Sequence, residues 1–168
     1  MIAIEKISLA QYQKDRLDTA PGTQMTLPQL EEEYAGIILP RRGTLVSAGY
    51  DFHTPFSLTL EPGETLVVPT GLRAIMEDDM WLGIYIRSSL GFKYGVRLVN
   101  SVAVIDADYA WADNEGHLKI GIYNGGNQAI ALKAGDAFAQ GIFQRYYRTD
   151  DDEPINRRRT GGFGSTNL

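Results

Sequence analysis

The chain has 168 residues, a length sufficient for one domain with its own hydrophobic core. Its formal net charge of −5 at pH 7 disfavours a general nucleic-acid binder, which would normally have a basic face. It has no cysteine and two histidines, which excludes disulfides and cysteine-based metal sites and disfavours a histidine-built zinc site. No apolar run approaches the roughly 20 residues that span a bilayer and no basic segment followed by an apolar stretch opens the chain, so we expect a soluble, cytoplasmic protein.

The first 46 residues predict one strand and one helix. The opening segment IAIEKISLA alternates loosely between apolar and polar residues, which is typical of a strand. Residues 11–46 are less regular. Within them, TLPQLEEEYAGI has the features of a helix start, with Thr26 as N-cap, Pro28 in the first turn and acidic residues close behind.

From residue 55 onwards, short apolar segments alternate with turn signals. Two similar segments, 56–72 and 128–143, each predict a hairpin, with turns at the Pro-Gly pair 62–63 and the Ala-Gly pair 134–135. The stretches WLGIYIRSS and HLKIGIYN place leucines and isoleucines on one face of a strand, and VRLVNSVAVID is strand-like twice over.

Many short strands and little helix predict an all-β domain, an antiparallel jelly roll or β-barrel, over residues 1–147. After Tyr147 the chain turns polar. We expect residues 148–168 to form a flexible C-terminal arm rather than a further pair of strands.

Two polar segments before residue 96 could carry chemistry. In SAGYDFHT, Gly49 and Asp51 precede a strand, and a turn glycine with a capping aspartate is the simpler interpretation. In IRSSLGFKYG, a strand ends in Arg87 and is followed by Ser88 and Ser89. A guanidinium, hydroxyls and free backbone N–H groups at a strand end suit an anion, although an ordinary polar turn has the same composition.

Two later segments are also candidates. In NSVAVIDADY, Asn100 precedes two carboxylates, Asp106 and Asp108, and Tyr109 follows them. Carboxylates two residues apart on a strand point to the same side, so one could activate a water while the other shapes its field; a solvated turn is the alternative. Gln140 lies inside the apolar stretch FAQGIF, where it needs hydrogen-bond partners or an edge position facing water.

The chain closes with RRRTGGFGSTNL, in which three arginines precede a glycine-rich stretch with one aromatic ring, Phe163. Such a stretch cannot build a core, and a disordered tail is its plainest interpretation. The alternative is a phosphate clamp with an aromatic lid, since Arg157–Arg159 is the densest positive charge in the chain.

The order and spacing of these segments resemble those of the trimeric dUTP pyrophosphatase (dUTPase) family over residues 45–168. That family has five ordered motifs, which here are AGYDF (48–52), RSSLG (87–91), NSVAVIDADY (100–109), AQGIF (139–143) and GGFGST (161–166). The resemblance implies a jelly-roll fold and a homotrimer with active sites shared between subunits. It also implies hydrolysis of dUTP to dUMP and pyrophosphate, which limits uracil incorporation into DNA and supplies dUMP for dTTP synthesis.

The resemblance also implies roles for the candidate residues. Asp106 matches the carboxylate that activates the attacking water, and Asp51 and Asp108 support the site. Mg²⁺ would be held by the three phosphates and by waters, with no direct protein ligand. The remaining implied contacts are Arg87, Ser88, the Ser89 N–H and Gln140 with the phosphates, Tyr109 against the deoxyribose, and Asn100 at the uracil edge.

In the family the C-terminal arm closes over the nucleotide, usually at a neighbouring subunit. By resemblance, Phe163 would stack on the uracil ring. Either Arg158 or Arg159, together with Gly164, Ser165 and Thr166, would bind the β- and γ-phosphates.

Two departures and two alternatives accompany the resemblance. Phe138 stands where many members have arginine, and AWADNE (110–115) is an insertion that could alter substrate access or trimer contacts. A dCTP deaminase shares the fold and the RSSL motif, but it needs a glutamate where this chain has Gly121. A nucleotide-gated regulatory binding protein on the same scaffold would bind dUTP without releasing pyrophosphate, and residues 11–46 and the insertion would offer it a surface.

Overall fold

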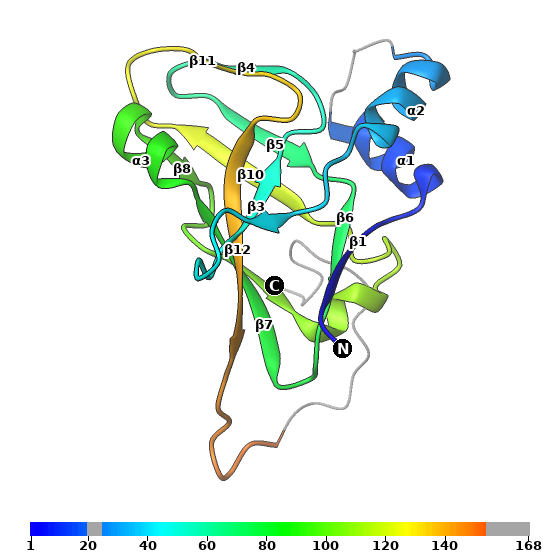
Figure 1. The fold of residues 1–168 in the computed structure, drawn as a ribbon, viewed down its shortest axis with the longest axis vertical. Coiled ribbons are helices and arrows are strands. Elements are labelled where there is room, and N and C mark those ends of the chain that lie inside the picture. Colours follow the sequence, from blue (N-terminus) through cyan, green and yellow to red (C-terminus); the bar gives the residue numbers. More distant parts are fainter. Residues whose placement is uncertain (20–24, 154–168) are drawn as a thin grey trace.

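The computed structural model describes residues 1–19 and 25–153 (Figure 1). In chain order the elements are β1 (Ala3–Lys6), α1 (Leu9–Thr19), α2 (Leu27–Ala35), β2 (Arg41–Arg42), β3 (Tyr50–His53), β4 (Leu58–Leu60), β5 (Thr65–Pro69), β6 (Leu72–Ile75), β7 (Met80–Ile86), α3 (Ser88–Tyr94), β8 (Val96–Leu98), β9 (Ala103–Asp106), the 3₁₀ helix η1 (Ala107–Trp111), β10 (Lys119–Asn124), β11 (Ile130–Leu132) and β12 (Ala137–Arg145).

Every strand pair in this described part is antiparallel. The largest sheet has the order β2-β3-β12-β7-β9, a second has the order β5-β10-β8, and β1-β6 and β11-β4 form two short pairs. The chain crosses repeatedly between these sheets, which is the behaviour of a jelly roll. The prediction of an all-β fold with little helix is confirmed.

The helix expected after Thr26 is present as α2. The Thr26 hydroxyl accepts the Gln29 backbone N–H (3.4 Å), and the Gln29 side-chain oxygen accepts the Thr26 N–H (2.8 Å), so the two residues form a reciprocal capping box. The opening strand is shorter than expected, because β1 ends at Lys6. The helix α1 (Leu9–Thr19) replaces the end of that expected strand and the first part of segment 11–46, which we expected to be less regular. Figure 1 shows α1 and α2 side by side at one edge of the molecule.

Both predicted hairpins are wrong in their pairing. β4 and β5 flank the Pro-Gly turn at 62–63, but β4 pairs with β11 and β5 pairs with β10. Likewise β11 and β12 flank the turn at 134–135 and join different sheets. The turn at 62–63 is held against β10, because the Gly63 N–H donates to the carbonyl of Asn124 (2.8 Å) on that strand.

The core lies between the sheets. Leu118, Ile120 and Ile122 alternate inward as the sequence predicted. On the five-stranded sheet the same alternation buries one face and leaves the other partly exposed, with polar side chains such as Asp51 and Gln140 beside apolar ones such as Val104. The residues that fill the core from that sheet and from its neighbours include Phe52, Val68, Leu82, Ile84, Leu98, Phe138 and Ala139.

Candidate active site

The outward face of the five-stranded sheet gathers three candidate residues from three motifs. Asp51 on β3 lies opposite Gln140 on β12, and both side chains share the face that points away from the core. The Asp51 carboxylate pairs with Arg87, at 3.3 Å between Oδ1 and Nε. We call Asp51, Arg87 and Gln140 the phosphate-side cluster, because it presents a guanidinium and an amide at one sheet end.

Local backbone features hold this cluster in place. The Arg87 N–H donates to the Phe138 carbonyl (3.1 Å), which fixes the end of β7 against β12. A Cβ at Gly49 would lie 2.5 Å from Oε1 of Gln140, so a larger residue there would displace the end of this amide side chain from its present position.

Ser88 and Ser89 follow directly and are exposed in the first turn of α3. The alternative interpretation of this segment was an ordinary polar turn; the structure instead forms a helix that ends at Gly95 in the left-handed conformation (φ 70°). The first N–H groups of a helix lack intrahelical partners, so the Ser89 N–H keeps the donor capacity that an anion site at this strand end requires.

The residues of the third motif lie at the other edge of the same sheet. Asp106 is exposed at the end of β9, opposite Trp81. Asn100 is exposed in the tight turn before β9, where its carbonyl accepts the Val102 N–H (2.7 Å). The expectation that Asp106 and Asp108 share a strand is wrong. The strand ends at Asp106, and Asp108 lies in η1, so strand alternation does not align the two carboxylates.

Tyr109 is buried, with 5% of its surface exposed. Its hydroxyl donates to the His117 carbonyl (2.9 Å) and accepts from Nδ2 of Asn114 (2.8 Å). The phenol oxygen therefore anchors the loop that follows η1. Packing of its ring against a deoxyribose stays a prediction.

The register of β7 separates the two groups of candidates. Gln140 lies opposite Tyr85 and Asp106 lies opposite Trp81. These two positions are four residues apart on β7, which is about 13 Å along an extended strand. Within one chain, Asp106 is therefore remote from the phosphate-side cluster.

The two departures from the family pattern have structural explanations. Phe138 is fully buried in the core, so a guanidinium at this position would lie in the apolar interior. The insertion at 110–115 is tied to the N-terminal segment, because the Glu115 carboxylate accepts both the N–H (2.7 Å) and the hydroxyl (2.6 Å) of Ser8. Trp111, 60% exposed, has the Arg73 guanidinium 5.8 Å from its ring centroid.

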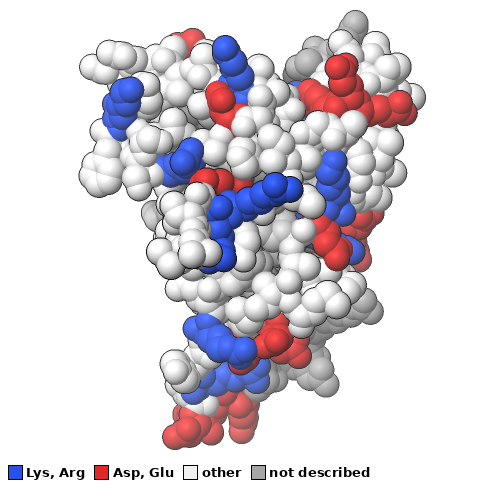
Figure 2. Space-filling model, in the orientation of Figure 1, with Lys and Arg blue, Asp and Glu red and all other residues white. Residues whose placement is uncertain are grey.

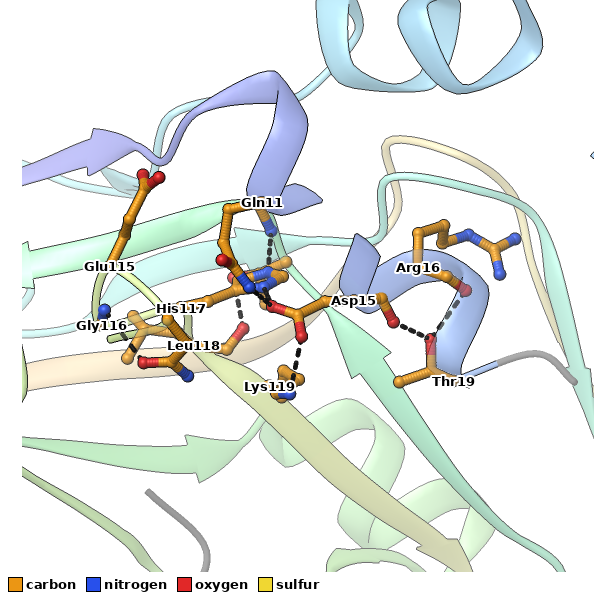
Figure 3. Close-up of polar contacts among 12 residues, drawn as sticks. Gln11, Asp15, Arg16, Thr19, Glu115, Gly116, His117, Leu118 and Lys119 are labelled. Atoms are coloured by element: carbon orange, nitrogen blue, oxygen red, sulfur yellow. Dashed lines mark hydrogen bonds and ion pairs between the residues drawn. The ribbon is translucent and has the colours of Figure 1, made fainter. Parts of the chain in front are cut away.

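Sequence reasoning missed a buried cluster of charged groups beneath α1 (Figure 3). His117 Nδ1 lies 2.6 Å from Oδ2 of Asp15, and Lys119 Nζ lies 3.0 Å from Oδ1 of the same carboxylate. Gln11 donates a third hydrogen bond to Asp15 (2.8 Å). The signal was obscured because Asp15 is far from His117 in sequence.

An Asp–His pair is a common arrangement for acid–base catalysis, but this one is structural. The Gly71 backbone N–H donates to His117 Nε2 (2.8 Å), which fixes the neutral tautomer with Nδ1–H donating to Asp15. Neither ring nitrogen is left to take a substrate proton. Burial lowers the pKa of His117, against the attraction of Asp15. Burial also opposes ionisation of Asp15, but its hydrogen bonds, from His117 first, hold the pKa of this carboxyl well below its usual range.

The chain has no glutamate on β10 at the position where a dCTP deaminase would need its acid–base group, because Gly121 stands there. Gly121 lies opposite Val67, and a Cβ there would be 3.1 Å from Cγ2 of Val99, so even a small side chain would be crowded. Within residues 1–19 and 25–153, no three His, Asp or Glu side chains are grouped as metal ligands.

The last motif lies outside the described residues. Its candidate residues are Arg158, Arg159, Phe163, Gly164, Ser165 and Thr166. In the part of the chain that the structure describes, no helix is long and apolar enough to cross a membrane.

Comparison with known proteins gives a consistent family. A family model described as dUTPase matches residues 35–167. The deoxyuridine 5'-triphosphate nucleotidohydrolase of Lactococcus lactis is 42% identical over 134 residues, which cover 79% of this chain and 89% of the relative. The protein of the same name from Shewanella piezotolerans is 36% identical over 155 residues, which cover 88% and 91%.

Solved structures agree with this assignment. The dUTPase of Streptococcus mutans aligns with a TM-score of 0.62 at 37% identity, over 68% of this chain and 90% of its own. A dUTPase of Staphylococcus bacteriophage 80alpha, at 17% identity, aligns with a TM-score of 0.60 over 100% of this chain and 99% of its own, so the likeness in fold is not confined to the matched family region. The matched family region contains all five motifs and the phosphate-side cluster, and the chain belongs to the dUTPase family.

Proposed function

We propose that the chain hydrolyses dUTP to dUMP and pyrophosphate, and so limits uracil incorporation into DNA and supplies dUMP for dTTP synthesis. The observation that carries the proposal is the phosphate-side cluster, in which β3, β12 and the end of β7 bring Asp51, Gln140 and Arg87 together at one sheet end. Membership of the dUTPase family supports the choice of substrate.

The reaction needs a water to attack the α-phosphorus in line, against the negative charge of the phosphates. Positioning and charge neutralisation matter more for such chemistry than covalent help. Arg87, Ser88, the Ser89 N–H and Gln140 hold phosphate oxygens in this proposal. Asp106, exposed at the end of β9, takes the proton of the attacking water.

The nucleoside end is held by other residues. Asn100 and the backbone around it contact the uracil edge, and the Tyr109 ring closes the space beside C2′ of the sugar. Asp51 keeps the Arg87 guanidinium oriented, and Asp108 supports the field at Asp106. The C-terminal arm, 148–168, closes over the bound nucleotide through Phe163 and the arginine and hydroxyl side chains near it.

Mg²⁺ is part of the proposal as a companion of the substrate. In this proposal the ion arrives on the triphosphate; Asp51 is paired with Arg87, and no three His, Asp or Glu side chains are grouped within the described residues. Bound there, Mg²⁺ would neutralise charge on the phosphates.

The active enzyme in this proposal is a homotrimer with shared sites. A general base must lie within hydrogen-bond reach of the water it activates, directly or through one water, and Asp106 is too far from the phosphate-side cluster of its own chain. A second copy can supply the missing carboxylate. Val104, 58% exposed beside Asp106, offers an apolar contact for that copy. Sedimentation of an active, stable monomer would reject this part.

A steady-state assay with dUTP, dCTP and dTTP tests the activity. We expect pyrophosphate release from dUTP, with much lower kcat/KM for the other two nucleotides. Release of ammonia from dCTP would instead indicate a deaminase, and tight dUTP binding without turnover would indicate a regulatory binding protein. The proposal places the enzyme in the cytoplasm, with its nucleotide substrate, and cell fractionation tests that location.

A further inference from the structure

A pocket of about 510 Å³ opens beside the phosphate-side cluster, and arginines line it. Its wall includes Arg41 and Arg42 of β2 together with Asp51 and His53 of β3. Figure 2 shows Lys and Arg side chains gathered in the middle of this face, over β2 and β3. This local positive charge stands out in a chain whose net charge is −5, and it favours an anionic ligand.

The two arginines differ in what they already bind. Arg42 is used by its own loop, because Nη1 donates to the carbonyls of Leu45 (3.0 Å) and Ser47 (3.4 Å). Arg41 is exposed, and no hydrogen bond or ion pair to another described residue engages its guanidinium. A side chain with five donors and no acceptor among the described residues can donate to a ligand.

The ladder places Arg41 in line with the cluster. Arg41 lies opposite Asp51, and Asp51 lies opposite Gln140, so the three side chains share one face of β2, β3 and β12. Adjacent strands are about 4.8 Å apart, so Arg41 and Gln140 are separated by roughly 10 Å. That distance exceeds a single phosphate and suits a chain of phosphates.

The residues next to Gln140 on β12 and the imidazole of His53 supply no positive charge near Arg41. On β12 the residues beside Gln140 are Ala139 and Gly141, which carry no cation. Burial lowers the pKa of His53, against the attraction of Asp51, so the imidazole stays neutral near pH 7. Among the described residues that line the pocket, Arg41 is the cation whose donors are not already used by the protein, and it extends the row begun by Arg87.

We propose that Arg41 binds the terminal phosphates of the substrate's triphosphate, as a second guanidinium beside Arg87. This inference rests on the proposed function, because it takes the nucleotide's phosphates to lie across the phosphate-side cluster. It adds a residue between the second helix and the first motif, where the family resemblance assigned no contact. A ligand with β- and γ-phosphates gains from Arg41, whereas a nucleoside monophosphate does not reach it.

The test compares Arg41→Ala and Arg41→Lys with Arg97→Ala. Arg97 is an exposed arginine on β8, in the other sheet, where its guanidinium stacks on Tyr123 (4.5 Å), so its removal changes the net charge equally without touching the pocket. Three quantities are measured for each variant: KM for dUTP, Kd for inorganic tripolyphosphate, and inhibition by dUMP. Circular dichroism and sedimentation confirm that each variant is folded and assembled.

We expect Arg41→Ala to raise both KM for dUTP and Kd for tripolyphosphate by about tenfold or more, since a hydrogen bond to a charged group is lost. Arg41→Lys should lose less, and dUMP inhibition should not change. Equal values in Arg41→Ala and Arg97→Ala would overturn the inference, and so would a parallel loss of dUMP binding. If the wild-type chain does not release pyrophosphate from dUTP, the proposed function fails instead, and the tripolyphosphate measurement still judges Arg41.

Discussion

At the scale of single residues, the proposed chemistry depends on Asp106. Replacing it with asparagine keeps the shape of the side chain but removes its ability to take a proton. We expect Asp106→Asn to lower kcat by about 10²- to 10⁴-fold, the usual cost of losing a general base. Binding of a non-hydrolysable dUTP analogue should stay within about tenfold of wild type.

Asp113→Asn is the matched control, because Asp113 is an exposed carboxylate in the insertion with no assigned role. Its kcat should equal that of the wild type. Near-normal turnover by Asp106→Asn would show that another group activates the water.

Tyr109 combines two functions that its variants separate. Its hydroxyl holds the loop at His117 and Asn114, and its ring is proposed to exclude a 2′-hydroxyl. Tyr109→Phe should lower the free energy of unfolding by about 1–2 kcal/mol in urea titrations while keeping the preference for dUTP over UTP. Tyr109→Ala should narrow that preference in kcat/KM. A preference unchanged by the alanine variant would place the selectivity elsewhere.

The sequence suggests the candidate residues one by one, and their roles stay predictions, whereas it does not show which of them lie together. Motif order identified Asp51, Arg87 and Gln140 singly. Their common location depends on the ladder register between β3 and β12, and register is set by long-range pairing that short motifs do not encode. The prediction that Asp108 points to the same side as Asp106 was wrong because the strand ends at Asp106, two residues before Asp108.

At the scale of elements, α1 is held to the sheet by the Asp15–His117 pair, and this makes the fold sensitive to acid. Burial lowers the pKa of His117, so the unfolded chain takes up this proton at a higher pH than the folded chain does. The free energy of unfolding should therefore fall as the pH drops below about 6.5, the usual value for histidine. The low pKa of Asp15 acts in the same direction, but only below about 3.9.

Urea titrations between pH 7.5 and pH 5 measure this effect. His117→Gln keeps a polar side chain without the titrating ring, and its stability should depend less on pH over this range, although it starts lower. Burial also lowers the pKa of His53, so His53 can contribute to the pH dependence of stability. Comparison with His53→Gln separates the contribution of His117 from that of His53. Identical pH profiles for wild type and His117→Gln would show that this histidine does not cause the acid sensitivity.

The elements that sequence analysis missed share one physical cause. The buried face of α1 consists of Tyr12, Asp15 and Arg16, so apolar periodicity does not mark it as a helix. α2 was predictable because its start depends on local capping chemistry. The hairpin predictions were wrong in their pairing. Apolar alternation indicates which side chains are buried and turn residues indicate where the chain reverses, but neither indicates which strand becomes the hydrogen-bonded partner.

At the scale of the whole molecule, the proposed site is divided into two groups of residues that lie apart in one chain. Arg87, Asp51 and Gln140 lie at one end of the outward face, and Asp106 lies across β7 and about 13 Å further along it. The family assignment and this separation lead to the same expectation, that the working site is made by more than one copy of the chain.

Mixing two inactive variants tests most directly whether one active site combines residues from two copies of the chain. Asp106→Asn lacks the base and Arg87→Ala lacks the phosphate contact, and each should be nearly inactive alone. In mixed assemblies, formed by co-expression or by subunit exchange, some sites combine Asp106 from one copy with Arg87 from another. We predict that the mixture regains a substantial fraction of wild-type dUTP turnover. A mixture that assembles but stays as inactive as its parents would contradict the shared site, because each chain would then carry both residues of its own.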